Sequence, residues 1–201
     1  MQITKIVITG GPCAGKSTAM SWIKEAFEKT GYTVLFVPET ATELITGGVA
    51  PWTCGTCLEY QKCQIKLQIA KEDIFEQAAR TMNAEKILIV CDRGLMDNKA
   101  YMNEEEFVAA LEYVGMTESN FCSRYDAVFH LVSCAKGAES FYTTDNNGAR
   151  TETLEQAAAL DDRLESAWCV HPDFAVIDNS CGFEEKMQRL IEKISNFLLN
   201  H

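Results

Sequence analysis

The stretch IVITGGPCAGKST at residues 6–18 joins an apolar run to a glycine-rich turn. Residues 10–17 fit the pattern GxxxxGK[ST], in which a tight loop follows a strand and opens a helix. Glycines allow the backbone to curl so that successive N–H groups point inward at phosphate oxygens, and the helix that starts near Lys16 adds its positive end. The stretch therefore predicts a strand–loop–helix unit that binds a nucleoside triphosphate. The alternative is a glycine-rich turn that binds no ligand.

Each residue type in this loop has a chemical role. The Lys16 ammonium can contact the β- and γ-phosphates, and the Ser17 hydroxyl can ligate Mg²⁺. We therefore expect Mg²⁺ as the cofactor and ATP or GTP as the co-substrate. The residues expected to bind the nucleotide are Gly10, Gly11, Pro12, Cys13, Ala14, Gly15, Lys16, Ser17 and Thr18.

Apolar runs and helical stretches alternate along the chain, which is typical of a parallel sheet covered by helices. We expect an α/β fold of the P-loop NTPase type, with a five-stranded parallel sheet between two layers of helices. The expected strands are Ile3–Thr9, Thr33–Val37, Lys86–Cys91, Asp126–Val132 and Phe174–Asp178. The expected helices are Lys16–Lys29, Glu39–Thr46, Leu58–Met82, Leu95–Met102, Glu104–Val114, Glu118–Cys122, Leu154–Trp168 and Glu184–Leu199.

Length and composition favour one soluble domain over residues 1–201. The chain has 201 residues, 47% of them hydrophobic, and a net charge of −11, and an acidic surface repels nucleic acid. Its nine cysteines are odd in number, so we expect reduced thiols and a cytoplasmic location. Residues 1–5 do not have the pattern of a signal peptide, and no apolar stretch is long enough to cross a bilayer. The sequence carries no signal for an oligomeric state.

The third expected strand is followed directly by Asp92 and Arg93. Ligands of parallel α/β folds bind outside the carboxyl ends of the strands, so Asp92 is placed to hold Mg²⁺ through water, across from Ser17. The alternative is that Asp92 caps the next helix. Motor-like ATPases carry a glutamate beside this aspartate, whereas Arg93 would contact a phosphate or an acceptor. The DxxG and NKxD motifs of regulatory GTPases are absent from the corresponding places, which argues against an ordinary GTPase.

Glu39 follows the second expected strand, again at the carboxyl edge of the sheet. Small-molecule kinases of this architecture need a carboxylate near this point to accept the proton of the attacking hydroxyl. Glu39 is therefore a candidate general base or substrate hydrogen-bonder, and the alternative is a first-turn acid that the helix dipole favours. Glu43, one turn later, is the second choice for the same role. Asp97 is a further candidate for the same cleft.

Residues from about 136 to 152 lose apolar periodicity and gain Gly, Asn, Asp and Thr, which predicts a polar, mobile lid loop. Such a loop can close over bound phosphates and bring positive charge to the transferred group. Arg150 is the candidate for this charge, and the alternative is a solvated loop residue. Lys136 is the other cation of the loop. Arg163, in the next helix, is a further candidate, with a surface ion pair as its alternative.

Several segments along the whole chain resemble one protein family. These segments are GGPCAGKST, VPETATELI, CDRGLMDNKAYM, YDAVFHLV, NNGARTET, ALDDRLESAW and HPDFAVIDNS. They are similar to the AAA-domain family that is related to ribosylnicotinamide kinase and to the TRPL-translocation-defect protein. The DRG triplet, with Ala100 and Tyr101 after it, also looks like thymidylate and deoxynucleoside kinases.

The resemblance implies a nucleoside-kinase-like fold with a lid, and ATP or GTP binding with Mg²⁺. The positions to which the family's roles carry over are Lys16, Ser17, Asp92, Arg93 and Arg150. Because the family mixes metabolite kinases with nucleotide-dependent regulators, two hypotheses of function follow. The first is transfer of the γ-phosphate to a hydroxyl of a small nucleoside-like acceptor. The second is a nucleotide-gated binding protein that has slow hydrolysis or none and no small-molecule acceptor.

The first hypothesis assigns a role to each candidate catalytic residue. Lys16 holds the phosphates and Asp92 holds Mg²⁺ together with Ser17. Glu39 receives the proton of the acceptor hydroxyl, while Arg93 and Arg150 neutralise charge on the transferred group. The partners expected under this hypothesis are a nucleoside triphosphate and a small-molecule acceptor.

The cysteines and the strand-end residues give weaker signals. Cys54 and Cys57 form one CxxC pair, which could hold zinc or act as a redox pair, although a second pair is missing. Cys13 could be oxidised at the start of a helix, or could simply be a small residue that fits the loop. Asn179, together with the serine that follows it, could touch the base or end a strand. His130 is expected to be a core or sheet-edge residue.

Overall fold

The computed structural model describes residues 1–138 and 153–201 of the chain. All five strands lie in one parallel sheet in the order β2-β3-β1-β4-β5. The strands are β1 (Gln2–Thr9), β2 (Thr33–Val37), β3 (Lys86–Asp92), β4 (Ala127–Leu131) and β5 (Phe174–Ile177). Each expected strand is found with ends that differ by at most one residue, which confirms the parallel sheet predicted from the alternating pattern.

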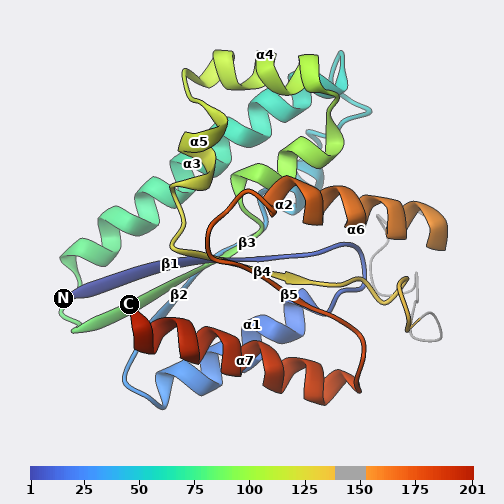
Figure 1. The fold of residues 1–201 in the computed structure, drawn as a ribbon. Helices are drawn as coiled ribbons and strands as arrows, with labels where there is room; N and C mark the ends of the chain where they lie inside the picture. The colour runs from blue at the N-terminus through green and yellow to red at the C-terminus, as the bar shows by residue number, and fades with distance from the viewer. Residues whose placement is uncertain (139–152) are drawn as a thin grey trace.

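Helices cover both faces of the sheet (Figure 1). One face carries α1 (Lys16–Glu28) and α7 (Phe183–Asn200). The opposite face carries α3 (Cys57–Thr81), α4 (Glu104–Val114), α5 (Glu118–Cys122) and α6 (Leu154–Trp168). The short helix α2 (Thr40–Thr46) packs against α3. The predicted layers are therefore confirmed for the described residues.

The predicted helix at 95–102 is a 3-10 helix, η1 (Leu95–Tyr101). Its first turn is held from outside the helix, because the Leu95 N–H donates to the Tyr125 hydroxyl at 2.8 Å. Asn98 also donates to the Leu95 carbonyl at 2.9 Å and to Gln68 Oε1 at 3.1 Å. The contacts with Tyr125 and Gln68 come from distant elements, so the apolar pattern predicts a helical segment but not its tighter type.

Successive residues of the central strands enter two different cores. Ile6 and Ile8 of β1 pack in the core beneath α1 and α7, whereas Val7 packs in the core beneath the other helices. The same alternation holds in β3, where Val90 faces the first core and Ile89 the second. Burial on both faces explains why these strands are continuous apolar runs.

The connections of the sheet create a crevice at its carboxyl edge. The neighbouring strands β1 and β4 lead into helices on opposite faces, because β1 continues into α1 and β4 leads to α6. Where neighbouring strands connect to helices on opposite faces, an opening is left outside the carboxyl ends of the strands. Ligands of open α/β sheets bind in this opening. The two chain termini lie together at the opposite, amino-terminal edge (Figure 1), where Gln2 and His201 line one shallow groove.

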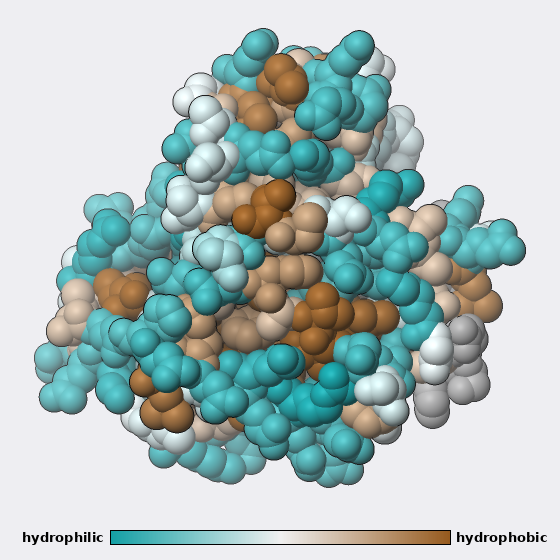
Figure 2. All heavy atoms as spheres, viewed as in Figure 1, coloured by the Kyte–Doolittle hydropathy of each residue, from teal (hydrophilic) through white to brown (hydrophobic). Residues whose placement is uncertain are grey.

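The surface seen from the same side is mainly hydrophilic, with hydrophobic residues gathered in separate patches (Figure 2). The outer faces of the helices provide most of this polar cover; in α7, for example, Glu184 and Glu185 are exposed whereas Met187 and Leu190 are buried. Within residues 1–138 and 153–201, no helix combines the length and the apolarity needed to cross a membrane.

Candidate nucleotide-binding site

The phosphate loop, residues 10–18, joins β1 to α1 at the crevice. Gly10 and Gly15 have φ angles of 139° and 92°, values that side chains with a Cβ rarely adopt. A Cβ on Gly10 would lie 2.0 Å from the carbonyl oxygen of Leu131, so glycine is also required for space. Cys13 adopts a φ of 55° without being glycine. The loop therefore forms the tight turn that the GxxxxGK[ST] pattern predicts.

Lys16 extends back across the phosphate loop. Its Nζ donates to the carbonyl oxygens of Gly10 at 2.9 Å and Gly11 at 3.3 Å. Burial, and then the charge of Arg93, lower the pKa of Lys16 to about 8. Ser17 is exposed at the start of α1 and lines the same cleft. A charged ammonium, an adjacent hydroxyl and a helix N-terminus thus meet at one opening.

Asp92 ends β3 next to this loop. Its Oδ1 is buried and has no hydrogen-bond partner among the described residues. Burial raises the pKa of Asp92, and the charge of Lys16 partly opposes that rise. The alternative role as a helix cap does not apply, because Asp97 accepts the Gly94 N–H at 2.8 Å at the start of η1. A buried carboxylate oxygen without a partner among the described residues, in a residue that lines the same cleft as Ser17, fits a hydrated Mg²⁺ ion.

Arg93 joins the two acidic candidates of the cleft. Its Nε donates to Glu39 Oε1 at 2.5 Å, and its Nη1 donates to Asp97 Oδ1 at 3.2 Å. Asp97 is itself buried and accepts hydrogen bonds from Thr9 and Trp168, the latter at 3.0 Å. Arg93 has a φ of 70°, which is uncommon for a residue with a Cβ. The guanidinium is therefore fixed in the cleft lining by two carboxylates, those of Glu39 and Asp97.

Glu39 is the N-cap residue of α2 rather than its first residue, and it makes no side-chain cap. Thr42 donates to its second oxygen, Oε2, at 2.6 Å. Burial alone would raise the pKa of Glu39, but Arg93 and Lys16 outweigh that effect and lower it to about 2. Glu39 is thus a carboxylate paired with Arg93. Glu43, the second choice for the same role, is paired instead with Lys71.

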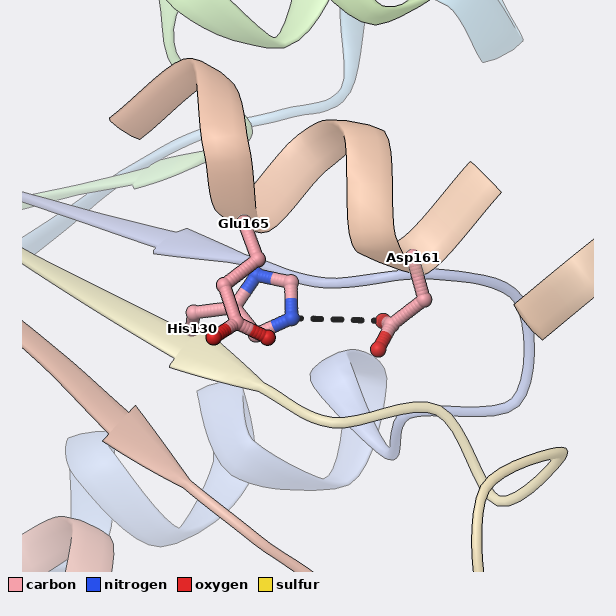
Figure 3. A group of neighbouring side chains, drawn as sticks. All are labelled: His130, Asp161 and Glu165. Carbon is pink, nitrogen blue, oxygen red and sulfur yellow. Dashed lines mark ion pairs between the residues drawn. The ribbon is translucent and has the colours of Figure 1, made fainter. Parts of the chain in front are cut away.

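Asp161 of α6 anchors the phosphate loop and is not among the site residues predicted from the sequence. Its Oδ1 accepts the Gly11 N–H at 2.7 Å and the Ser133 N–H at 3.1 Å. His130 of β4 lies beside it, with 3.3 Å between Nε2 and the same Oδ1 (Figure 3). Burial alone would raise the pKa of Asp161, but the contact with His130 and then the hydrogen bonds from the Gly11 and Ser133 N–H groups lower it. Asp161 thus links α6, the end of β4 and the loop.

Figure 3 also shows Glu165 directed toward His130 from the next turn of α6. His130, Asp161 and Glu165 are the one group of three metal-ligating side chains found among residues 1–138 and 153–201. The Lys136 ammonium lies 3.4 Å from Asp161 Oδ2 and 3.8 Å from Glu165 Oε2. The lysine therefore already compensates the negative charge of these two carboxylates. Cys54 and Cys57 belong to no such group within those residues.

Lys186 of α7 supports the loop from the opposite face of the sheet. It is 3% exposed, and its Nζ donates to the carbonyl oxygens of Val132 at 2.6 Å and Ala14 at 3.2 Å. It also donates to Asn179 Oδ1 at 2.8 Å. Asn179 in turn donates to the Ser133 carbonyl at 2.8 Å, so it fixes the end of β4 rather than projecting freely toward a base.

The remaining candidates lie in several places. Arg150 and most of the expected lid fall outside the described residues. Arg163 is exposed on α6 and is not part of the cleft lining. Cys13 lies against Cys134 at the end of β4, and burial followed by this contact raises the pKa of Cys134 to about 11. His130 is fully buried, as expected.

Most of the described candidate residues line one cleft of about 1510 Å³. Its lining includes residues 12–18 of the phosphate loop and residues at the carboxyl ends of β2 and β3, namely Glu39, Asp92 and Arg93. Ligand pockets in proteins are commonly about 300–1,000 Å³. The cleft therefore has room for a nucleoside triphosphate and for a second small molecule beside it.

A family model described as an AAA domain matches residues 5–186 of the chain. The chain belongs to this AAA-domain family. The match runs from β1 into α7 and includes the phosphate loop, Asp92, Arg93 and Asp161. The match and the five-stranded parallel sheet together show a P-loop NTPase fold. Nucleotide binding is the property expected of such an AAA domain. Among curated proteins, none matches the chain.

Proposed function

We propose that the protein is a Mg²⁺-dependent phosphotransferase that moves the γ-phosphate of ATP or GTP to a hydroxyl of a small nucleoside-like metabolite. The observation that carries this proposal is the ion pair between Arg93 and Glu39 in the cleft that contains the phosphate loop. A protein that only bound nucleotide would need the loop and a metal ligand. It would not need a second carboxylate and a guanidinium at the neighbouring strand ends.

The phosphate loop would bind the triphosphate through its backbone N–H groups and the Lys16 ammonium. Binding would draw the ammonium from the Gly10 and Gly11 carbonyls to the more strongly charged phosphates. Ser17 and Asp92 would hold the Mg²⁺ ion, which supplies charge neutralisation at the β- and γ-phosphates.

Arg93 and Glu39 would exchange partners during the reaction. While Arg93 contacts Glu39, the pKa of that carboxylate is about 2, which makes it a weak base. A transferred phosphoryl group would attract the guanidinium away from Glu39. The pKa of Glu39 would then rise, because burial is the largest single influence on it. Glu39 would become a better acceptor for the proton of the attacking hydroxyl when the phosphoryl group is in place.

Asp97 would keep Arg93 at the cleft during this exchange. Its contacts with Thr9, Gly94 and Trp168 fix the carboxylate independently of Glu39. Arg150 is a further candidate to neutralise the transferred group, as the sequence indicates.

The proposal is tested by measuring nucleotide turnover with Mg-ATP and with Mg-GTP against a panel of nucleosides and vitamins. We expect at least one acceptor to raise turnover well above the rate without acceptor and to yield a phosphorylated product by mass spectrometry. If nucleotide binds tightly while no acceptor raises turnover, the protein is a nucleotide-gated regulator instead.

A further inference from the structure

A row of polar side chains on α3 faces the cleft beside Arg93. Tyr60, Gln61, Gln64 and Gln68 all line the cleft, and none is more than 7% exposed. The glutamines are separated by three and four residues, so they lie on one face of the helix. Buried carboxamides are unfavourable unless they make hydrogen bonds. The partners of each member of the row therefore indicate its role.

Two members of the row have partners within the protein. Gln64 Nε2 donates to Asn98 Oδ1 at 2.7 Å. Gln68 accepts from Asn98 Nδ2 at 3.1 Å and donates to the Arg93 carbonyl at 3.3 Å. These two side chains hold η1 and the Arg93 backbone, which accounts for their burial.

The other two members lack partners. Tyr60 Oη and Gln61 Oε1 are buried and make no hydrogen bond with any described residue. Burial, and then the charge of Glu39, raise the pKa of Tyr60 to about 12, so its hydroxyl stays protonated and can donate. Both groups lie in a cleft that already has a phosphate site and has room for a second molecule. Unpaired buried polar atoms of this kind are rare in folded proteins and call for an explanation.

An aromatic residue lies at the same cleft. Trp52, in the connection between α2 and α3, lines the cleft and is 72% exposed. A large exposed indole offers an apolar face on which a flat ring can stack, and Phe36 of β2 is a second aromatic residue in the lining. The cleft thus combines aromatic faces with unpaired polar groups.

We propose that Tyr60 and Gln61 form the acceptor subsite, and that they select an acceptor whose flat ring carries an amide-type edge with adjacent N–H and C=O groups. The Gln61 carboxamide can accept from the ring N–H and donate to the ring carbonyl. Tyr60 donates to an oxygen of the acceptor near Glu39. This inference rests on the proposed phosphotransfer, because it names the class of molecule that receives the phosphate.

The probes are uridine and inosine, which carry such an edge, their ring-N-methylated forms N3-methyluridine and N1-methylinosine, and ribose, which has no ring base. Binding to the protein loaded with a non-hydrolysable ATP analogue is measured by calorimetry, and turnover is measured with Mg-ATP. We expect uridine or inosine to bind and to be phosphorylated. Methylation of the ring nitrogen should lower kcat/KM about 100-fold, because it leaves the buried Gln61 oxygen without a hydrogen bond.

The test variants are Gln61→Leu and Tyr60→Phe, and the matched control is Gln77→Leu, the same substitution at an exposed position of α3. Gln61→Leu should remove the discrimination between methylated and unmethylated probes, and Tyr60→Phe should raise KM for the acceptor. The affinity for the ATP analogue should stay unchanged in all three. Neither Gln61→Leu nor Tyr60→Phe should lower Tm, because each removes an unpaired buried group.

The outcomes separate this inference from the proposed function. If ribose is phosphorylated as well as the nucleosides, or if Gln61→Leu keeps the discrimination, phosphotransfer stands and the subsite assignment is wrong. If uridine or inosine binds in a Gln61-dependent manner but no phosphate is transferred, the subsite stands and the kinase proposal is wrong. If no probe binds or reacts, or if Gln61→Leu lowers Tm strongly, the assignment is overturned because the row is then purely structural.

Discussion

The Arg93 guanidinium and the Glu39 carboxylate form an ion pair across the candidate site, with 2.5 Å between Nε and Oε1. The two residues are 54 positions apart in the sequence and follow adjacent strands, β3 and β2. Arg93 is shared between Glu39 and Asp97, so the guanidinium partly compensates the charge of both carboxylates in the resting site. A negatively charged phosphoryl group is the kind of ligand that can separate them.

Glu39→Gln should reduce acceptor-dependent turnover about 100-fold to 10,000-fold while leaving nucleotide affinity almost unchanged. The amide keeps the shape of the side chain but cannot take the proton of the acceptor. Turnover by coupled assay and affinity by titration with a fluorescent ATP analogue measure the two properties. Glu43→Gln, in the first turn of α2 that Glu39 precedes, serves as the control and should retain turnover. Equal activity of Glu39→Gln and the wild type would rule out the general-base role.

Lys16→Ala should abolish measurable affinity for Mg-nucleotide, because it removes the ammonium that lies at the Gly10 and Gly11 carbonyls of the phosphate loop and would contact the phosphates. The fluorescent titration used for Glu39 detects the loss. Lys24→Ala, at an exposed position of α1, is the control and should bind as the wild type does. Retained affinity in Lys16→Ala would mean that the ligand binds elsewhere.

Nucleotide affinity should fall as the pH rises above about 8. The pKa of Lys16 without ligand is about 8, and bound phosphates would raise it, so binding above this pH requires uptake of a proton. We expect a loss of about tenfold per pH unit until the pKa of the bound form is reached. Calorimetry in two buffers of different ionisation enthalpy measures the uptake. Lys16→Arg stays charged throughout and should remove the dependence; a slope that persists would point to Lys186, whose pKa burial also lowers to about 8.

Asp161→Ala should lower the free energy of unfolding by about 2 kcal/mol and weaken nucleotide binding, because the buried N–H groups of Gly11 and Ser133 lose their acceptor. Denaturant unfolding and the nucleotide titration measure the two effects. Asp162→Ala removes the exposed neighbour, which pairs with Lys136, and should cost at most about 1 kcal/mol. Equal effects of the two substitutions would contradict the anchoring role.

Glu72→Gln should destabilise the fold by about 3 kcal/mol without altering the cleft. Glu72 is fully buried on α3, where it accepts from Tyr125 at 2.7 Å and pairs with Lys5 at 3.3 Å and Arg124 at 3.2 Å. The substitution leaves two cations without their buried partner. Thermal or denaturant unfolding gives the change, and Glu59→Gln, in an exposed pair on the same helix, should have little effect.

Local patterns were sufficient to predict most of the fold. The strand–loop–helix unit is encoded in consecutive residues, and the long apolar runs of β1 and β3 follow from burial on both faces. The positions of Asp92 and Glu39 at the carboxyl edge also follow from the sequence, because strand ends of a parallel sheet meet there.

Asp161 and Lys186, which hold the phosphate loop, were not predicted because their partners lie far away in the sequence. Gly11 and Asp161 are 150 residues apart, and Ala14 and Lys186 are 172 apart. A signal was present: Asp161 lies in the buried stripe of α6 with Leu160 and Leu164, and a charged residue in such a stripe needs a partner. The pattern shows that a partner exists but not which residue it is.

The position of the two chain ends has a practical consequence for work on this protein. Because Gln2 and His201 border the same groove at the edge remote from the strand-end cleft, an affinity tag or a surface tether at either end leaves the cleft facing solution. The same proximity suits a short peptide that joins the ends into a circular chain, since neighbouring termini favour permutation. Immobilised or cyclised protein should therefore report nucleotide binding as the free chain does.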